Sequence, residues 1–135
     1  MELAADQAPG EQRRTILLVE DDVLLRIALA DHLRSNGYHV IEAGTVIEAA
    51  TVLSSGPTVH LVFSDVDLPG GSGGLSLAVW IGTHHPDVPV ILTSGVHIVV
   101  PARAGRGQIP FIAKPYDFDA VAASIGAAIA DRSIS

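Results

Sequence analysis

Carboxylates and a lysine follow three short apolar runs in this sequence, at the points where strands would end. They are Glu20, Asp21 and Asp22 after the first run, Asp65 and Asp67 after the second, and Lys114 after the third. In an open parallel sheet, ligands bind outside the carboxyl ends of the strands, so these side chains would meet at one edge. Carboxylate oxygens suit a hard cation such as Mg²⁺, and a neighbouring ammonium group suits a phosphoryl group. The combination points to phosphate chemistry on an aspartate.

The composition describes one domain with an aliphatic core and a net negative charge. The 135 residues fit a single ordinary domain, and 48% of them are apolar while only 4% are aromatic. A net charge of −7 argues against a nucleic-acid partner, because phosphate binding needs clustered Lys and Arg. Cysteine is absent, which excludes disulfides and thiolate metal sites.

The apolar runs and the N-terminus bear on location and domain bounds. No apolar run reaches the roughly 18 residues needed to span a bilayer, so we expect no membrane partner. Residues 1–12 lack the basic start and apolar stretch of a secretory signal. We therefore expect a cytoplasmic protein with a flexible N-terminal tail at 1–14, a domain at 15–131 and a C-terminal tail at 132–135.

From Thr15 onward, apolar runs alternate with helical periods, a pattern typical of α/β folds. The strands are expected at 15–19, 39–43, 59–64, 88–93 and 111–113. Helices are expected to begin at Asp22, at Thr45 and near Phe118, and to end at Asn36-Gly37, at Gly56-Pro57 and near Asp131. The inward face of the first helix is predicted to hold Leu25, Ala28, Leu29 and Leu33.

Two stretches depart from this alternation. Residues 68–74 form a Gly-rich loop whose glycines would let the backbone approach a ligand closely. Residues 96–108 show no helical face, and Pro101 and two glycines interrupt them. A fourth helix is therefore expected to be short or missing.

The chain resembles the receiver domain of two-component response regulators over about residues 15–131. The resemblance rests on four motifs in the family's order and spacing, at 17–22, 62–70, 89–95 and 111–116. It implies a flavodoxin-like, doubly wound sheet of five parallel strands in the order 2-1-3-4-5. The segments Thr-Ser-Gly at 93–95 and Lys-Pro-Tyr at 114–116 are similar to those of a subgroup of single-domain receivers.

The resemblance also assigns roles to individual residues. It implies Asp65 as the phospho-acceptor, Glu20 and Asp21 as Mg²⁺ ligands together with Asp65 and the main-chain carbonyl of Asp67, Lys114 as the site lysine, and Ser94 and Phe111 as the switch residues. Ser94 stands where threonine is commoner, and Phe111 stands where tyrosine is frequent, which removes a ring hydroxyl. A histidine kinase or a phosphotransfer protein would be the donor, and an unknown protein would receive the signal.

We expect a stand-alone phospho-switch, monomeric or weakly dimeric, that catalyses only its own phosphoryl transfer and dephosphorylation. Ser94, Phe111 and the segment 96–108 would change conformation. The sequence leaves open whether a further output domain exists. One alternative is a haloacid-dehalogenase-like phosphatase, because Asp65-Val66-Asp67 matches the Asp-x-Asp core of that family. Such cores usually follow a first strand, whereas Asp65 follows the third. The other alternative is a receiver fold that signals without phosphate.

Overall fold

The computed structural model describes residues 13–68, 73–95, 102–103 and 107–134 of the chain. The elements, in chain order, are β1 (Thr15–Val19), α1 (Val23–Ser35), β2 (His39–Ala43), α2 (Val46–Ser54), β3 (Leu61–Asp65), α3 (Gly73–His84), β4 (Val90–Ser94), β5 (Ala102–Arg103), β6 (Gly107–Gln108), β7 (Phe111–Ala113) and α4 (Phe118–Ile134). Strands thus alternate with helices over most of the described chain, as the sequence predicts.

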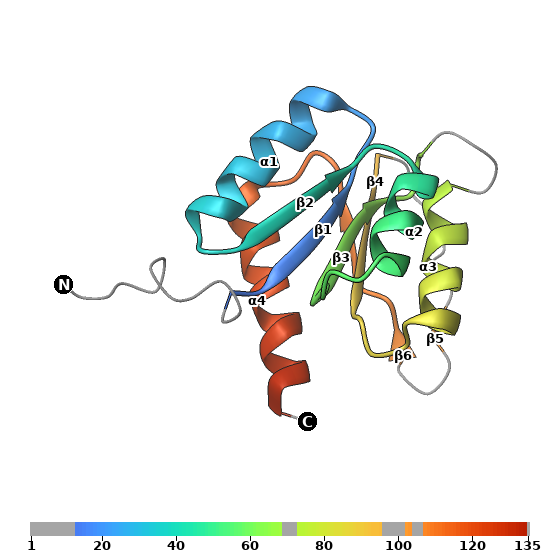
Figure 1. Cartoon of the computed structure of the whole chain (residues 1–135). Helices are drawn as coiled ribbons and strands as arrows, with labels where there is room; N and C mark the ends of the chain where they lie inside the picture. Colours follow the sequence, from blue (N-terminus) through green and yellow to red (C-terminus); the bar gives the residue numbers. More distant parts are fainter. Residues whose placement is uncertain (1–12, 69–72, 96–101, 104–106, 135) are drawn as a thin grey trace.

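Five strands form one parallel sheet in the order β2-β1-β3-β4-β7, with helices on both of its faces (Figure 1). On one face, β1 and β3 side chains pack against α1 and α4, with Phe63 and Ile125 fully buried. On the other face, the strands pack against α2 and α3, with Leu77 and Ile81 fully buried. The predicted flavodoxin-like sheet and its strand order are confirmed.

The register of the strands brings the ends of β1, β3, β4 and β7 to one edge of the sheet. Val19 pairs with Ser64, and Asp65 pairs with Thr93. Ser94 pairs with Ala113, so Lys114 comes directly after the last paired position. The carboxylates and the lysine therefore lie together at the carboxyl ends of these strands, which we call the site edge, as the strand-end argument requires.

The first two helices begin where the sequence predicts. The carboxylate of Asp22 accepts a hydrogen bond from the Leu25 backbone N–H at 3.1 Å, and the Thr45 hydroxyl accepts one from Glu48 at 3.0 Å. The predicted inward face of α1 is partly wrong, because Ala28 is exposed and Ala30 is buried in its place. The helix is rotated so that Leu29, Ala30 and Leu33 contact the sheet.

No bounds for helix α3 were predicted from the sequence, and the bounds of two strands shift by one or two residues. The helix begins at Gly73, inside the segment interpreted as a Gly-rich loop, whose residues 69–72 lie outside the described part of the chain. Four glycines in 70–74 indicate a loop by composition, but Gly73 and Gly74 are buried at the start of this helix. Strands β3 and β4 begin and end slightly later than predicted, and α4 continues to Ile134.

The region of the expected fourth helix contains a short antiparallel pair instead. In its described residues, β5 pairs with β6, with Ala102 opposite Gln108 and Arg103 opposite Gly107. The prediction of a missing fourth helix is confirmed for these residues, while 96–101 and 104–106 lie outside the described ranges. No helix within the described ranges is long and apolar enough to cross a membrane.

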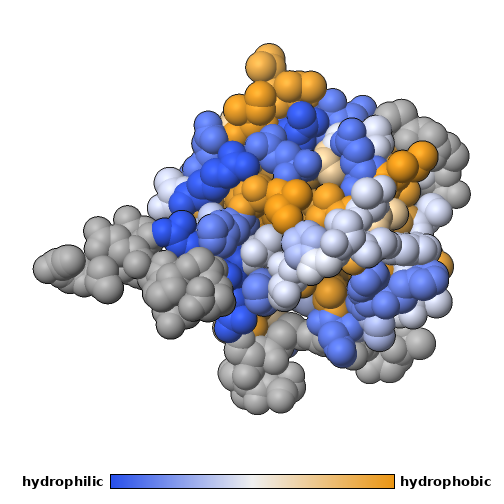
Figure 2. All heavy atoms as spheres, in the orientation of Figure 1, coloured by the Kyte–Doolittle hydropathy of each residue, from blue (hydrophilic) through white to orange (hydrophobic). Residues whose placement is uncertain are grey.

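Apolar side chains are also exposed on the surface of α1 (Figure 2). Leu24 has 80% of its surface exposed, and Val23 and Ile27 are also exposed. All three belong to the first five residues of α1, directly after the acidic turn at the end of β1. The site edge of the sheet is therefore bordered by an apolar surface.

Gly74 packs its backbone against the end of β3, and this contact generates a stability prediction. A Cβ at Gly74 would overlap the carbonyl oxygen of Asp65 and lie 2.7 Å from Val66 Cα. We expect Gly74→Ala to lower the free energy of unfolding by about 1–3 kcal/mol, as overpacked sites do. In α4, Gly126→Ala should instead stabilise by roughly 1 kcal/mol, because its Cβ would lie 3.6 Å from the Tyr38 hydroxyl, an ordinary contact.

Urea unfolding of the parent and the two variants would measure both changes. The two substitutions are chemically identical and both lie in helices, Gly74 in the first turn of α3 and Gly126 in the interior of α4. The opposite signs are expected from the space around the added methyl group. A Gly74→Ala variant as stable as Gly126→Ala would contradict the close packing of α3 on β3.

Candidate functional site

Asp65 is the last residue of β3 and lies at the centre of the site edge. Its side chain is almost fully buried, and one oxygen, Oδ2, accepts a hydrogen bond from Lys114 Nζ at 2.9 Å. The other oxygen, Oδ1, accepts one from the Asp67 backbone N–H, also at 2.9 Å. Both carboxylate oxygens are therefore fixed by named donors.

Glu20 lies on the neighbouring strand end and shares the same lysine. It is only 2% exposed, and its Oε1 lies 2.9 Å from Lys114 Nζ. Its Oε2 accepts a hydrogen bond from the Asp22 backbone N–H at 3.0 Å. Burial raises the pKa of Glu20 above its ordinary value, although the hydrogen bonds from Lys114 and Asp22 oppose this.

Lys114 bridges the two buried carboxylates with a single ammonium group. Partial burial lowers its pKa, but the hydrogen bonds to Glu20 and Asp65 outweigh this and raise the pKa above its ordinary value. The lysine therefore stays charged at neutral pH. A permanent positive charge at this point offsets the repulsion between Glu20 and Asp65.

Three carboxylates are close enough to hold one cation. One oxygen from each of Glu20, Asp21 and Asp65 lies within 4.8 Å of the others. Asp21 is exposed, whereas Glu20 and Asp65 are buried, so the group is open on the side of Asp21. An all-oxygen, anionic donor set fits a hard divalent cation such as Mg²⁺.

The Asp67 side chain makes contacts that the sequence did not predict. Its Oδ2 accepts a hydrogen bond from Ser94 Oγ at 2.8 Å and one from the Gly95 backbone N–H at 3.3 Å. Ser94 and Asp67 are 27 residues apart in the sequence, so only the register of β3 and β4 could have indicated their hydrogen bond. The predicted role of the Asp67 carbonyl as a metal ligand stays a prediction.

Ser94 and Phe111, the two predicted switch residues, lie on adjacent strands at different depths. Ser94 is the buried last residue of β4, and its carbonyl accepts a hydrogen bond from the Lys114 backbone N–H at 2.9 Å. Phe111 is half-buried at the start of β7, where it pairs with Leu92. Ser94 therefore belongs to the site edge, whereas Phe111 packs against the core below it.

Tyr116 is a site residue to which the sequence analysis gave no role. Its ring packs edge-on against Phe63, with centroids 5.8 Å apart, and its buried hydroxyl has no hydrogen-bond partner among the described residues. Burial, with a further contribution from Glu20, raises the pKa of Tyr116 to about 12. Its position directly after Lys114-Pro115 was the available signal.

An acidic edge of this kind, on a sheet of this order, defines a receiver domain. The family model described as "Response regulator receiver domain" matches residues 16–126. The chain belongs to this family. The family match favours this assignment over the phosphatase alternative. Receiver domains are phosphorylated on an aspartate and generally act as signalling modules.

Curated relatives support the assignment. The chain is 35% identical to the response regulator protein FleR of Pseudomonas aeruginosa in an alignment of 104 residues that covers 76% of this chain and 22% of FleR. It is 33% identical to the sensor kinase CckA of Brucella abortus in an alignment of 114 residues that covers 82% of this chain and 12% of CckA. It is 31% identical to the regulatory protein VirG of Agrobacterium tumefaciens in an alignment of 128 residues that covers 91% of this chain and 46% of VirG. The chain thus spans less than half the length of each of these relatives.

Solved structures share the fold. The receiver domain of the hybrid histidine kinase CckA has a TM-score of 0.72 at 30% identity, covering 85% of this chain and 98% of that one. A response regulator receiver protein from Sinorhizobium medicae has a TM-score of 0.81 at 21% identity, covering 90% and 98%. At the latter identity the likeness concerns the fold alone.

The different exposure of Asp21 and Glu20 predicts unequal contributions to Mg²⁺ affinity. Both oxygens of Glu20 already accept hydrogen bonds within the protein, whereas Asp21 is exposed. We expect Asp21→Asn to weaken Mg²⁺ binding more than Glu20→Gln, by roughly tenfold or more relative to the parent. Calorimetric titration with MgCl₂ would give both affinities, and a larger loss in Glu20→Gln would refute the ranking.

Proposed function

We propose that the protein is a phospho-accepting receiver of two-component signalling that is phosphorylated on Asp65. The observation that carries the proposal is the arrangement of Asp65, with its buried carboxylate held by Lys114 and with Glu20 and Asp21 beside it. In this reading residues 15–131 are the receiver unit, which acts in the cytoplasm as a monomer or weak homodimer. It catalyses its own phosphoryl transfer and dephosphorylation, and no reaction on an outside substrate.

The transfer would form one bond and break one bond. An oxygen of the Asp65 carboxylate attacks phosphorus, and the bond from phosphorus to the imidazole nitrogen of the donor breaks. The donor imidazole carries a proton on its other ring nitrogen, so the products are an aspartyl phosphate and a neutral histidine. Lys114 lies 2.9 Å from Asp65 Oδ2, and in this proposal it would pair with the new phosphoryl oxygens. Water later cleaves the acyl phosphate and restores the carboxylate.

A Mg²⁺ ion is the cofactor implied by the carboxylate group. Glu20, Asp21, Asp65 and the Asp67 carbonyl would hold it, and when bound it offsets the charge of the phosphoryl oxygens. Because Glu20 and Asp65 already share Lys114, the exposed Asp21 would face the side from which the ion enters.

The proposed donor is a histidine kinase or a phosphotransfer protein, and the receptor of the signal is a further protein. The exposed apolar residues Val23, Leu24 and Ile27 follow the acidic turn directly, which places an apolar contact surface beside the acceptor. Several relatives are named as response or transcriptional regulators and one as a sensor kinase, which agrees with such a pathway.

Switching would begin with a competition for the hydroxyl of Ser94. This hydroxyl donates to Asp67 Oδ2 at 2.8 Å, and a hydroxyl has only one proton to donate. If the Ser94 hydroxyl donates its hydrogen bond to a phosphoryl oxygen, its hydrogen bond to Asp67 is therefore lost. We propose that Phe111 and the segment 96–108 follow this movement, because β7 pairs with β4 and the segment begins two residues after Ser94 in the sequence.

The acceptor assignment is tested with acetyl phosphate and Mg²⁺, followed by intact mass measurement. The parent should gain one phosphate, and Asp65→Asn should gain none, because the amide lacks a nucleophilic oxygen of comparable strength. Asp67→Asn is the matched control, two residues away, and should still be labelled. Full labelling of Asp65→Asn would overturn the assignment.

The Ser94–Asp67 competition predicts a specific non-additivity. Removing the acceptor in Asp67→Ala should tighten binding of the phosphoryl mimic beryllofluoride about fivefold, the value of one hydrogen bond of about 1 kcal/mol. Ser94→Ala already removes the donor of this hydrogen bond, so in that background Asp67→Ala should not give the fivefold tightening. Equal tightening in both backgrounds would show that only the charge of Asp67 matters.

A further inference from the structure

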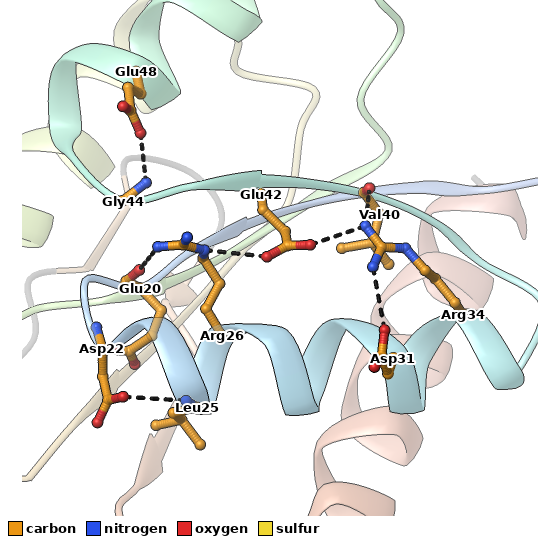
Figure 3. A network of polar contacts seen from close by, with 10 residues as sticks. All are labelled: Glu20, Asp22, Leu25, Arg26, Asp31, Arg34, Val40, Glu42, Gly44 and Glu48. Carbon is orange, nitrogen blue, oxygen red and sulfur yellow. Dashed lines mark hydrogen bonds and ion pairs between the residues drawn. The ribbon is translucent and has the colours of Figure 1, made fainter.

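Arg26 on α1 contacts the backbone of the acidic turn (Figure 3). Its Nη1 donates to the carbonyl oxygen of Glu20 at 3.0 Å, and its Nε donates to Glu42 Oε1 on β2 at 3.1 Å. The guanidinium is largely buried, with 19% of the side chain exposed. One side chain thus links the first turn of α1, the end of β1 and the edge strand β2.

The contact holds the carbonyl of the peptide that joins Glu20 to Asp21, between two neighbouring peptides that are also hydrogen-bonded. The Glu20 backbone N–H donates to the carbonyl of Ala43 at 3.0 Å, and its carbonyl accepts from Arg26. Beyond Asp21, the Asp22 N–H is bound by the Glu20 carboxylate. Asp21 lies between these fixed points, so the direction of its side chain depends on the peptide that Arg26 contacts.

The surroundings leave room for the guanidinium and supply its counter-charge. A Cβ at Gly44 would lie 3.1 Å from Arg26 Nη1 and 4.0 Å from the Glu20 carbonyl oxygen. Glu42 pairs through its other oxygen with Arg34 at 3.1 Å. Arg34 also donates to the Val40 carbonyl and makes none of the contacts to Glu20 that Arg26 makes (Figure 3). Arg26 and Arg34 therefore both pair with the Glu42 carboxylate, and of the two, Arg26 is the one that contacts Glu20.

We propose that Arg26, oriented by Glu42, is a positioning residue for the Mg²⁺ site. Its hydrogen bond to the Glu20 carbonyl restricts the rotation of the peptide between Glu20 and Asp21 and so helps to set the direction of the two carboxylates. This inference rests on the proposed use of these carboxylates for Mg²⁺. Partners that orient metal ligands change metal affinity by roughly 10- to 100-fold when they are removed.

The sign of the effect separates positioning from charge. Loss of a cation near a metal site makes the site more negative, which by itself strengthens binding of a divalent cation. Loss of positioning weakens binding. Arg26→Met keeps most of the apolar stem and removes the guanidinium, and Arg34→Met removes the same charge from the same carboxylate without touching Glu20.

Calorimetric Mg²⁺ titration of the unphosphorylated protein tests the proposal. We expect Arg26→Met to bind Mg²⁺ about tenfold more weakly, Arg34→Met to bind it as tightly as the parent or more tightly, and Arg26→Lys to lie between Arg26→Met and the parent. Unchanged or tighter binding in Arg26→Met would overturn the proposal. Equal weakening in both Met variants would also overturn it, because that outcome reflects general loosening of α1 on β2.

Hydrogen exchange without metal provides an independent readout. The Asp22 amide should exchange faster in Arg26→Met and at the parental rate in Arg34→Met, since its acceptor is the Glu20 carboxylate. An unchanged Asp22 rate in Arg26→Met would contradict the positioning role. A parent protein with no Mg²⁺ affinity would instead refute the proposed metal site, and the exchange rates would still decide the role of Arg26.

Discussion

The site depends on one ammonium group placed between two buried carboxylates. Glu20 and Asp65 end different strands, are each about 2% exposed, and both lie 2.9 Å from Lys114 Nζ. Two carboxylates in such surroundings repel each other and lose hydration. The ammonium group of Lys114 offsets both costs, so it allows the two strand ends to lie side by side.

The sheet supplies this arrangement through register rather than through contacts between the site residues themselves. Pairing of Val19 with Ser64 and of Ser94 with Ala113 fixes where each strand ends relative to its neighbour. A slip by one residue would turn every side chain to the opposite face. The aliphatic core that holds the register is therefore as much a requirement of the site as its polar groups.

Features that depend on local chemistry could be predicted from the sequence. The helix starts at Asp22 and Thr45 follow from side chains that cap neighbouring N–H groups, and β2 is bounded as expected because turn residues flank it. The site residues Asp65 and Lys114 could be placed because parallel strands bring their ends together. The start of helix α3 could not be predicted, because Gly73 and Gly74 serve close packing there while glycine generally indicates a loop.

Contacts between distant side chains were the other part that the sequence could not supply. The hydrogen bond from Ser94 to Asp67 requires the relative height of β3 and β4. The proposed role of Arg26 depends on the direction in which its side chain extends from α1, and on Gly44, which leaves space for the guanidinium. That Ala30 is buried and Ala28 is exposed could not be predicted either, because an alanine at either position fits the helical period.

Glu42 has a second consequence, which concerns the outer edge of the sheet. It lies on β2, the strand at one end of the sheet order, which has a neighbouring strand on only one side among the described residues. A strand from another molecule could extend the sheet there and begin aggregation. Glu42 carries a charge on this strand, and Arg26 and Arg34 bind it from α1. A foreign strand would have to accommodate the partly buried charges of Glu42 and Arg26 and the exposed guanidinium of Arg34, so this ion-pair group disfavours unwanted pairing at the edge.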